Sequence, residues 1–489
     1  MLDRLKDLES QSRKLDPGTE ERAALWQASR EYGEAFLQAL PETPAFVLKD
    51  RPGAGLADFP IPEAGRSFPQ VLGALAEHVD GVGANGASGR HLAFIPPSSL
   101  FAGALGDLLA ALTNRYAAYF FAGPGAVRME NQVIAWLARE MGLPEGSSGN
   151  LAAGGSMAHL VGICTAREAA GLKAADYAKA CVYLSDQAHH CIVKALRVAG
   201  MGEAQVREIP TDADFRLRPE ALEAAILADR RAGLRPWLLV PTAGTTNTGA
   251  VDPLEACADL ATRHGLWLHT DGAYGASFAL TEPGKATLRG LDRSDSLVLD
   301  PHKGLFAPLG LGAVLVRHLD PLRKAHAFQA DYLPSPPEDL EELSPSETTL
   351  EFSKHARALR LWLPLQLHGV AAFRAALEEK LLLARYAYDR IRQMPGVDPG
   401  PAPQLSVLAF RFLPPTGNAD AFNQALLQRL TAEGRIFLSG TKLNGAFHLR
   451  LAILAARTHK DEVDDALDRL QAAAKQLASR HAFLFSLDA

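Results

Sequence analysis

Short apolar runs alternate with helix-like segments from about residue 75 onward. Strands buried on both faces typically appear as such nearly continuous apolar runs. The runs are Ala180–Leu184, Trp237–Val240, Leu266–His269, Ser296–Leu299 and Ala313–Val316. Helical patterns lie between several of them, as at Pro219–Arg231 and Pro253–His264. The alternation predicts an α/β fold whose mostly parallel sheet is covered by helices on both faces.

The N-terminal region has a different pattern. Apolar residues recur at helical spacing over residues 20–40, at Leu25, Ala28, Tyr32, Phe36 and Leu40. Pro41 ends this pattern, and a Pro/Gly-rich connector follows at residues 51–69. A helical arm on such a connector cannot bury its apolar stripe alone. We therefore expect it to pack on the main body or on a second subunit.

The C-terminal region predicts a smaller lobe. Long helices are predicted at Leu359–His368 and Ala371–Met394, and strands at Val407–Phe412 and His448–Leu454. We therefore divide the chain into a helical arm with its linker (1–75), a large domain (76–370) and a small α+β domain (371–489). The acidic, proline-rich residues 333–347 lack apolar periodicity, which fits either a solvated loop or an active-site lid.

Charge and composition exclude several classes of protein. A net charge of −6 without a dense Lys/Arg stripe argues against a nucleic-acid partner. The longest apolar stretch, residues 101–121, is interrupted by Asp107, Asn114 and Arg115, which argues against a membrane span. The four cysteines have no CxxC spacing, and the charged N-terminus does not resemble a signal peptide. We therefore expect a cytoplasmic protein.

Two functional groups stand where apolar strands end. Asp271 follows Leu266–His269, and Lys303 follows Ser296–Leu299. An amine and a carboxylate are what a pyridoxal 5'-phosphate (PLP) enzyme requires, the lysine for a Schiff base and the carboxylate to keep the pyridine nitrogen protonated. Thr242 also follows a strand, so all three should meet at the carboxyl edge of the sheet. We expect burial to lower the pKa of Lys303.

Two further segments suit this cofactor. Gly155 and Ser156 lie in a Gly-rich turn that enters a helix, where free amides and the helix dipole favour a phosphate. His189 follows another strand and is suited to stack on an aromatic ring or to move a proton. The adjacent His189, His190 and Cys191 do not have the spacing of a metal site, so no metal is expected.

Five ordered segments resemble the group II PLP-dependent decarboxylases, which include aromatic-L-amino-acid and glutamate decarboxylases. These segments are Gly154–His159, Ser185–His189, Thr242–Thr246, His269–Tyr274 and Asp300–Lys303. The resemblance implies the PLP fold-type I (aspartate-aminotransferase-like) architecture, with a central, mostly parallel seven-stranded sheet. Asp300 departs from the asparagine that aromatic decarboxylases often carry.

The resemblance also implies a role for individual residues. It implies a Schiff base at Lys303, a pyridinium partner in Asp271, His189 stacked on the ring and Tyr332 as proton donor. It implies phosphate contacts from Gly155, Ser156 and the region from Ser296 to His302. Thr242 would lie near the ring hydroxyl and Ala273 beneath the ring. Segments 90–97 and 118–121 match the family's substrate pocket, so Ile95, Pro96 and Phe120 are candidate substrate-binding residues.

The expected reaction is α-decarboxylation of an L-amino acid, with an aromatic substrate favoured and a homodimer with interfacial sites implied. Other readings stay open. Arg128 would suit an acidic substrate, and Arg450 would suit the substrate carboxylate of an aminotransferase. An aldehyde synthase, which decarboxylates and oxidatively deaminates, is the nearest rival within the family. A non-catalytic paralogue is disfavoured by the intact Lys303, Asp271 and His189.

Overall fold

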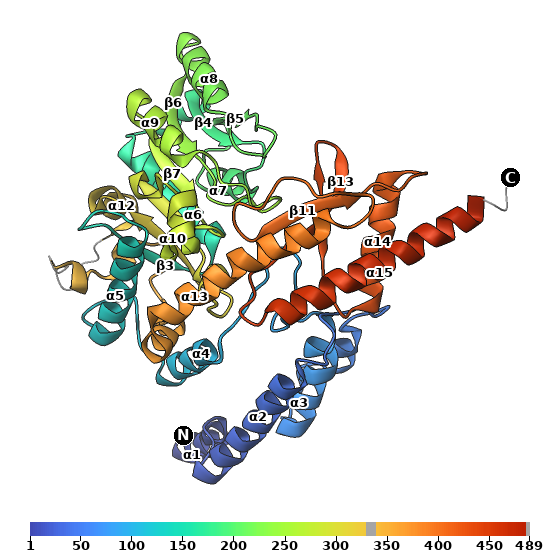
Figure 1. Ribbon diagram of the computed structural model, residues 1–489. Coiled ribbons are helices and arrows are strands. Elements are labelled where there is room, and N and C mark those ends of the chain that lie inside the picture. Colours follow the sequence, from blue (N-terminus) through green and yellow to red (C-terminus); the bar gives the residue numbers. More distant parts are fainter. Residues whose placement is uncertain (329–338, 486–489) are drawn as a thin grey trace.

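The computed structural model describes residues 1–328 and 339–485, arranged around a seven-stranded sheet (Figure 1). The sheet has the order β3-β9-β8-β7-β6-β4-β5. Neighbouring strands run parallel except β9, which is antiparallel to both β3 and β8. The strands are β3 (Ser148–Ala152), β4 (Ala180–Ser185), β5 (Gln205–Ile209), β6 (Arg235–Val240), β7 (Trp267–Asp271), β8 (Ser296–Leu299) and β9 (Gly312–Val316). The predicted mostly parallel sheet is confirmed.

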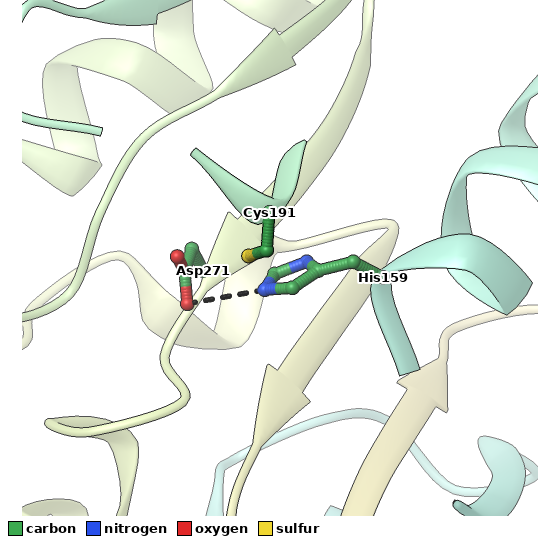
Figure 2. A group of neighbouring side chains, drawn as sticks. All are labelled: His159, Cys191 and Asp271. Carbon is green, nitrogen blue, oxygen red and sulfur yellow. Dashed lines mark ion pairs between the residues drawn. The ribbon is translucent and has the colours of Figure 1, made fainter. Parts of the chain in front are cut away.

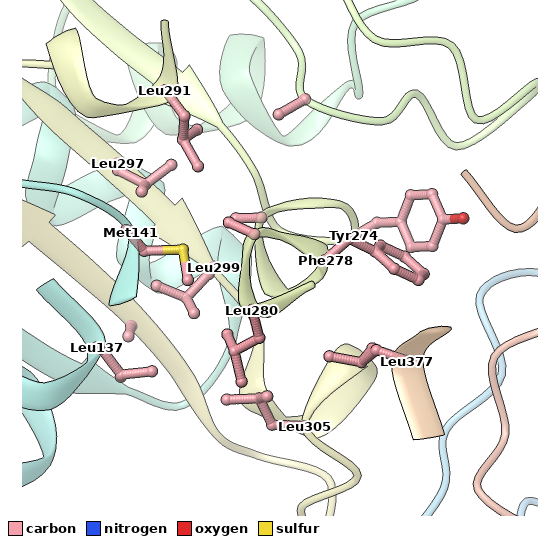
Figure 3. Close-up of a cluster of buried hydrophobic side chains, with 14 of the residues drawn as sticks. Leu137, Met141, Tyr274, Phe278, Leu280, Leu291, Leu297, Leu299, Leu305 and Leu377 are labelled. Carbon is pink, nitrogen blue, oxygen red and sulfur yellow. The ribbon is translucent and has the colours of Figure 1, made fainter. Parts of the chain in front are cut away.

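Helices cover both faces of this sheet, as its apolar strands require. On one face, Ala158 and Val161 of α6 pack against Val298 and Val314 of the sheet. On the other face, Leu297 and Leu299 belong to a large cluster shared with α5 and α13 (Figure 3). The helices of this region are α4 (Phe101–Thr113), α5 (Pro124–Glu140), α6 (Gly155–Ala169), α7 (Cys191–Val198), α8 (Pro219–Arg231), α9 (Leu254–His264), α10 (Glu282–Thr287), α11 (Pro301–Gly304) and α12 (Leu319–His326).

The cluster in Figure 3 also fixes the segments that carry chemistry. Tyr274 and Phe278 follow β7, and Leu305 follows α11; all three are at most 3% exposed. Burying each such side chain contributes roughly 1.5–3 kcal/mol. The chain that leaves the carboxyl ends of β7 and β8 is therefore held firmly against the sheet.

The small lobe is built on a four-stranded sheet of order β10-β11-β13-β12. Its elements are α13 (Leu359–Arg392), β10 (Val397–Asp398), β11 (Val407–Phe412), α14 (Ala419–Glu433), β12 (Ser439–Leu443), β13 (Ala446–Ala452) and α15 (Lys460–Phe485). Helix α13 runs from the large lobe into the small one and merges the two predicted helices. Gly369 interrupts it with a φ of 70°, beside the domain boundary predicted at residue 370.

The N-terminal arm consists of α1 (Leu2–Ser12), α2 (Thr19–Ala39) and α3 (Phe68–Leu75), with β1 (Phe46–Val47) paired to β2 (Gly83–Ala84). It projects from the rest of the chain in Figure 1. The predicted stripe of α2 is partly covered, but no residue of these three helices is buried. Trp26 is 47% exposed. A single chain therefore leaves the arm's apolar surface largely uncovered, as its sequence predicts.

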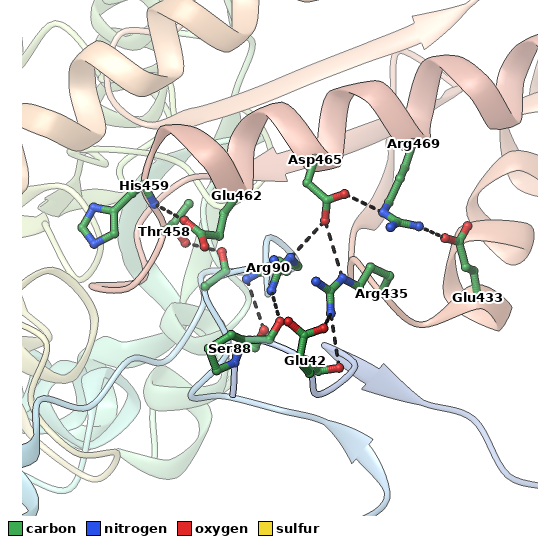
Figure 4. Close-up of polar contacts among 12 residues, drawn as sticks. Glu42, Ser88, Arg90, Glu433, Arg435, Thr458, His459, Glu462, Asp465 and Arg469 are labelled. Atoms are coloured by element: carbon green, nitrogen blue, oxygen red, sulfur yellow. Dashed lines mark hydrogen bonds and ion pairs between the residues drawn. The ribbon is translucent and has the colours of Figure 1, made fainter. Parts of the chain in front are cut away.

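Ion pairs tie the segment after the arm to α15 (Figure 4). Asp465 pairs with Arg90 at 3.0 Å and with Arg469 at 2.7 Å. Arg90 also donates to the carbonyl of Pro41 at 2.9 Å. These contacts hold residues 90–97, a candidate pocket segment, against the small lobe.

Candidate active site

A cavity of about 320 Å³ lies at the carboxyl edge of the central sheet. Its size suits a small-molecule site. Thr242, Asp271 and Lys303 all line it, as their positions after strands predict. The lining also includes Gly154, Gly155, Ser156, His159, His189, Cys191, Thr246, Ala273, Asp300 and His302. A larger cavity of about 760 Å³, between α5 and the start of α13, has no lysine or buried acid in its lining.

Lys303 lies in the first turn after β8 and is paired with a buried carboxylate. Its Nζ is 2.8 Å from Oδ2 of Asp300, which is 2% exposed. Burial alone would lower the pKa of Lys303, but the charges of Asp300 and Asp271 outweigh it and raise that pKa. The expectation that burial lowers the pKa of Lys303 is therefore wrong, because the sequence did not indicate the Lys303–Asp300 contact.

Asp271 ends β7 and faces His159 of α6 (Figure 2). His159 Nε2 is 3.4 Å from Asp271 Oδ1, and the amide of Ala273 donates to the same oxygen at 3.1 Å. Burial opposes charge on both side chains, yet their mutual attraction raises the pKa of His159 and holds that of Asp271 well below its usual range. Asp271 is therefore a buried anion with a histidine beside it.

A chain of polar side chains continues from His159 into the sheet. His159 Nδ1 is 2.9 Å from His269 Nε2, and His269 Nδ1 is 2.7 Å from Ser296 Oγ. Trp267 Nε1 donates to the same hydroxyl at 2.7 Å. Burial lowers the pKa of His269, and the charge of His159 adds to this effect, so that the pKa is about 3. A doubly protonated His159 can thus donate through Nδ1 to a neutral His269 while its charged ring forms an ion pair with Asp271.

Cys191 also lines the cavity and lies beside His159 and Asp271 (Figure 2). Potential ligand atoms of His159, Cys191 and Asp271 all lie within 4.8 Å of one another. Such a donor set can hold a metal ion. The sequence did not reveal this cluster because its three residues lie far apart along the chain. Nδ1 of His159 is already bonded to His269, and Asp271 faces the cavity. We therefore interpret the cluster as a group that orients the Asp271 carboxylate and not as a metal site.

The turn between β3 and α6 supplies an anion-binding position. Gly154 has a φ of 149°, and a side chain on Gly155 would place its Cβ 2.8 Å from Asp300 Oδ2. Amides in the first turn of a helix have no intrahelical partner. Ser156 is exposed to the cavity. His302, which also lines the cavity, bonds through Nδ1 to the carbonyl of Leu311 at 2.6 Å.

His189 and Thr242 line other walls of the cavity. The ring centroids of His189 and His190 are 4.1 Å apart. Burial lowers the pKa of His189, and the charge of His190 lowers it further. The amide of Thr242 donates to Asp252 at 2.8 Å. The Oγ1 of Thr242 is buried and has no hydrogen-bond partner among the described residues. That hydroxyl is therefore available to a ligand.

Four predicted residues do not line this cavity. Ser296 starts β8, at the opposite end of the strand from Lys303, and contacts His269 and Trp267. The prediction that Ser296 contacts the phosphate is therefore wrong, although the region up to His302 does reach the cavity. Ile95, Pro96 and Phe120 also lie outside the cavity lining of a single chain. Tyr332 lies outside the described residues.

Residues 339–347, the described part of the predicted loop or lid, are docked on α5. Asn131 donates to the carbonyls of Glu341 and Leu343 at 3.0 and 2.9 Å. Arg128 pairs with Glu341 at 2.9 Å and also with Glu342. Arg128 therefore has acidic partners within the chain and lies outside the cavity that contains Lys303.

Arg450 of β13 is committed to structural contacts. Its guanidinium donates to the carbonyls of Asn247, Phe94 and Thr246 and to the Ser439 hydroxyl. These bonds use four of the five N–H donors of an arginine. Arg450 therefore cannot bind a carboxylate in the bidentate manner expected of an aminotransferase arginine.

Comparisons with known proteins identify the family. Residues 54–411 match the pyridoxal-dependent decarboxylase conserved domain. An aromatic-L-amino-acid decarboxylase of Bacillus atrophaeus is 34% identical over 423 residues, which cover 86% of this chain and 88% of that protein. The chain belongs to the pyridoxal-dependent decarboxylase family and is a PLP-dependent carboxy-lyase that acts on an amino acid.

Two solved structures have the same fold over nearly the full chain. Oryza sativa TDC with PLP and tryptamine is 26% identical, with a TM-score of 0.89 and coverage of 95% of this chain and 99% of that chain. Rhodiola rosea 4-hydroxyphenylacetaldehyde synthase is 25% identical, with a TM-score of 0.87 and coverage of 94% and 99%. No helix within residues 1–328 and 339–485 is long and apolar enough to cross a membrane.

The cavity has the groups that PLP requires. Lys303 offers the amine, Asp271 a buried anion for the pyridine nitrogen, and the start of α6 an anion-binding turn. The orphaned hydroxyl of Thr242 offers a further polar contact. The residues present therefore fit this cofactor.

Proposed function

We propose that this enzyme removes the α-carboxylate of an aromatic L-amino acid as CO2 and releases the corresponding amine. The observation that carries the proposal is the convergence of Lys303 and Asp271 on one cavity. The aromatic preference is supported by the relatives, which include the Bacillus atrophaeus aromatic-L-amino-acid decarboxylase and a Camptotheca acuminata tryptophan decarboxylase.

Bound PLP supplies an electron-accepting ring for the electron pair left on the α-carbon when CO2 departs. Lys303 would hold the cofactor and then yield its place to the substrate amine. Asp271, supported by His159, would keep the pyridine nitrogen protonated at the buried end of the cavity. A protonated nitrogen makes the ring a better electron acceptor, so this ion pair would lower the barrier to CO2 loss.

The remaining cavity residues would orient the cofactor. The amides and hydroxyl at Gly155 and Ser156 would bind the phosphate, with His302 nearby. His189 would stack on one face of the ring and Ala273 would leave space on the other. Thr242 Oγ1 would meet the ring hydroxyl. Such fixed contacts hold the bond that breaks in one orientation and exclude water from it.

Substrate contacts are proposed at Ile95, Pro96 and Phe120. Support for the first two comes from Arg450, whose Nη2 bonds both to Phe94, next to Ile95, and to Thr246 in the cavity wall. Phe120 lies near Arg128, whose guanidinium carbon is 5.3 Å from the ring centroid. Phe120 would reach a substrate only across an interface between two subunits.

A homodimer is therefore part of the proposal. Helix α4 exposes Phe101, Leu108, Leu109 and Leu112, and Phe121 beyond it is 77% exposed. Exposed apolar side chains grouped on one helix are typical of a subunit interface, and the uncovered arm adds to them. Light scattering of the PLP-loaded protein tests the dimer, and a monomeric mass would contradict it. A cytoplasmic location is proposed as well, supported by four cysteines without a disulfide.

An aldehyde synthase is the second candidate, because phenylacetaldehyde synthases are among the relatives. Mass spectrometry of products from the PLP-loaded protein and pooled L-amino acids in air distinguishes the two reactions. We expect an amine from an aromatic component. An aldehyde with ammonia and peroxide would favour the synthase and would contradict the role predicted for Tyr332. An amine from an acidic component would contradict the aromatic preference.

A further inference from the structure

Asp300 places a second buried carboxylate at the position proposed for the cofactor phosphate. Its Oδ2 lies 2.8 Å from the Cβ position of Gly155, in the first turn of α6, and its Oδ1 lies 2.7 Å from the Cβ position of Gly312 in β9. A side chain at either glycine would collide with the carboxylate. The side chain is thus wedged between two glycines and faces the anion-binding turn.

One cation, Lys303, balances this carboxylate. Lys303 Nζ is 2.8 Å from Oδ2, whereas His302 Nε2 is 3.9 Å from it. Burial lowers the pKa of His302, so that ring is a weak source of positive charge. Two groups face Asp300 and Lys303 from β7 and the turn after it. The carbonyl of Ala273 accepts from the Asp300 amide, and Asp271 is another anion close enough to Lys303 to raise its pKa. The Oδ1 of Asp300 has no hydrogen-bond partner among the described residues.

Cofactor binding would remove this balance. Lys303 would have to lose its ammonium proton before its Nζ could form a C–N bond with the cofactor's carbonyl carbon, with loss of water. The phosphate brings a charge of about −1.5 to −2 to the same turn. A carboxylate next to a phosphate in a buried site is strongly disfavoured unless one of them is neutralised.

We propose that Asp300 is the proton acceptor for Lys303 during cofactor loading and stays protonated in the loaded enzyme. The proton moves from Nζ to Oδ2 across the 2.8 Å contact, which leaves a neutral amine and a neutral carboxyl group. The carboxyl group then donates its hydrogen to a phosphate oxygen. Asparagine at this position would make a similar donation without accepting a proton. The inference rests on the assignment of PLP to this cavity.

Infrared difference spectroscopy of the whole protein, before and after addition of PLP, tests the proposal. We expect the carbonyl stretch of a protonated carboxylic acid to appear, at about one group per Lys303–PLP linkage, and to shift in D2O. The band should be lost in Asp300→Asn. Asp259→Asn, which changes a surface carboxylate paired with Arg293, should keep it.

The visible absorbance of the Lys303–PLP linkage is recorded on the same samples. Linkage without the acid band, or a band that persists in Asp300→Asn, would overturn the proton-acceptor role alone. If Asp300→Asn does not bind PLP, the wild-type spectrum and its D2O shift still decide whether a carboxylic acid forms. Absence of the linkage in folded wild-type protein would instead overturn the assignment of PLP to this cavity.

Discussion

His159 Nε2 lies 3.4 Å from Asp271 Oδ1, and both side chains are buried. His159 belongs to the N-terminal part of α6, and its Nδ1 forms a hydrogen bond with Nε2 of His269. The carboxylate that would keep the cofactor's ring nitrogen protonated is therefore oriented by His159, a residue for which the sequence predicted no role.

Replacing His159 with glutamine removes the positive partner of Asp271 but keeps a side chain of similar size. We expect kcat/KM to fall about 10- to 100-fold, mainly through kcat, because the loss concerns orientation of a catalytic group. Steady-state kinetics with the preferred substrate measures this effect. His264→Gln, at a histidine paired with Glu223 away from the cavity, is the matched control. A fall in kcat of the same size in the control would contradict the assigned role.

The His159–Asp271 pair also predicts how stability depends on pH. The pKa of His159 is raised above its ordinary 6.5, so its contribution is complete below that pH and is lost as the pH rises through the folded-state value. The pKa of Asp271 is lowered from 3.8, so its contribution is lost only as the pH falls below that value.

Thermal unfolding of the cofactor-free protein tests this dependence. The difference in Tm between wild type and His159→Gln should be largest at about pH 5–6 and should shrink toward about pH 10. A difference that is constant or grows with pH would mean that the pair is not an ion pair in the folded chain.

Gly155→Ala tests the phosphate turn. The new methyl group would lie 2.8 Å from Asp300 Oδ2, so either the turn or the carboxylate must shift. We expect the Kd for PLP to rise at least about tenfold, equivalent to about 1.4 kcal/mol. Gly125→Ala, in the first turn of α5, meets nothing within 4 Å and should leave the Kd unchanged. Equal affinities in the two variants would place the phosphate elsewhere.

Arg450→Lys tests the contact between the two lobes. Lysine has three N–H donors on one atom and cannot span Phe94, Thr246 and Asn247. Since hydrogen bonds from charged donors each contribute about 1.5–3 kcal/mol, we expect a loss of at least about 2 kcal/mol and a lower Tm. Calorimetry measures it, with the exposed Arg392→Lys as control. Unchanged stability would show that these bonds do not hold the lobes together.

Local patterns predicted much of the fold because apolar periodicity reflects burial directly. The bounds of β8 were predicted as the structure has them, and α8 likewise. Strands β3 and β5 were missed because Ser148–Ala152 contains a glycine and polar residues, and Gln205–Ile209 is a half-exposed edge strand. Neither strand has the continuous apolar run used to find the others.

The site was predictable where a residue follows a strand or lies in a Gly-rich turn that enters a helix, as at Gly155 and Ser156. Asp271 and Lys303 lie where strands end, and the parallel sheet brings them together. His159 acts through a contact with Asp271, which lies far away in the sequence, and spacing does not reveal such a contact. Asp300 lies only three residues before Lys303, but its position against Gly155 and Gly312 likewise depends on the fold. Ser296 was misplaced because strand direction puts it at the opposite edge of the sheet from Lys303.

The measurement that tests the central claim most directly is release of labelled CO2 from a pool of carboxyl-labelled L-amino acids. The PLP-loaded wild type should release labelled CO2, and Lys303→Ala should release none while its far-UV circular dichroism stays native. Lys285→Ala, at an exposed lysine paired with Glu282, should match the wild type. Labelled CO2 from Lys303→Ala at the wild-type rate, or none from the wild type, would contradict decarboxylation at this cavity.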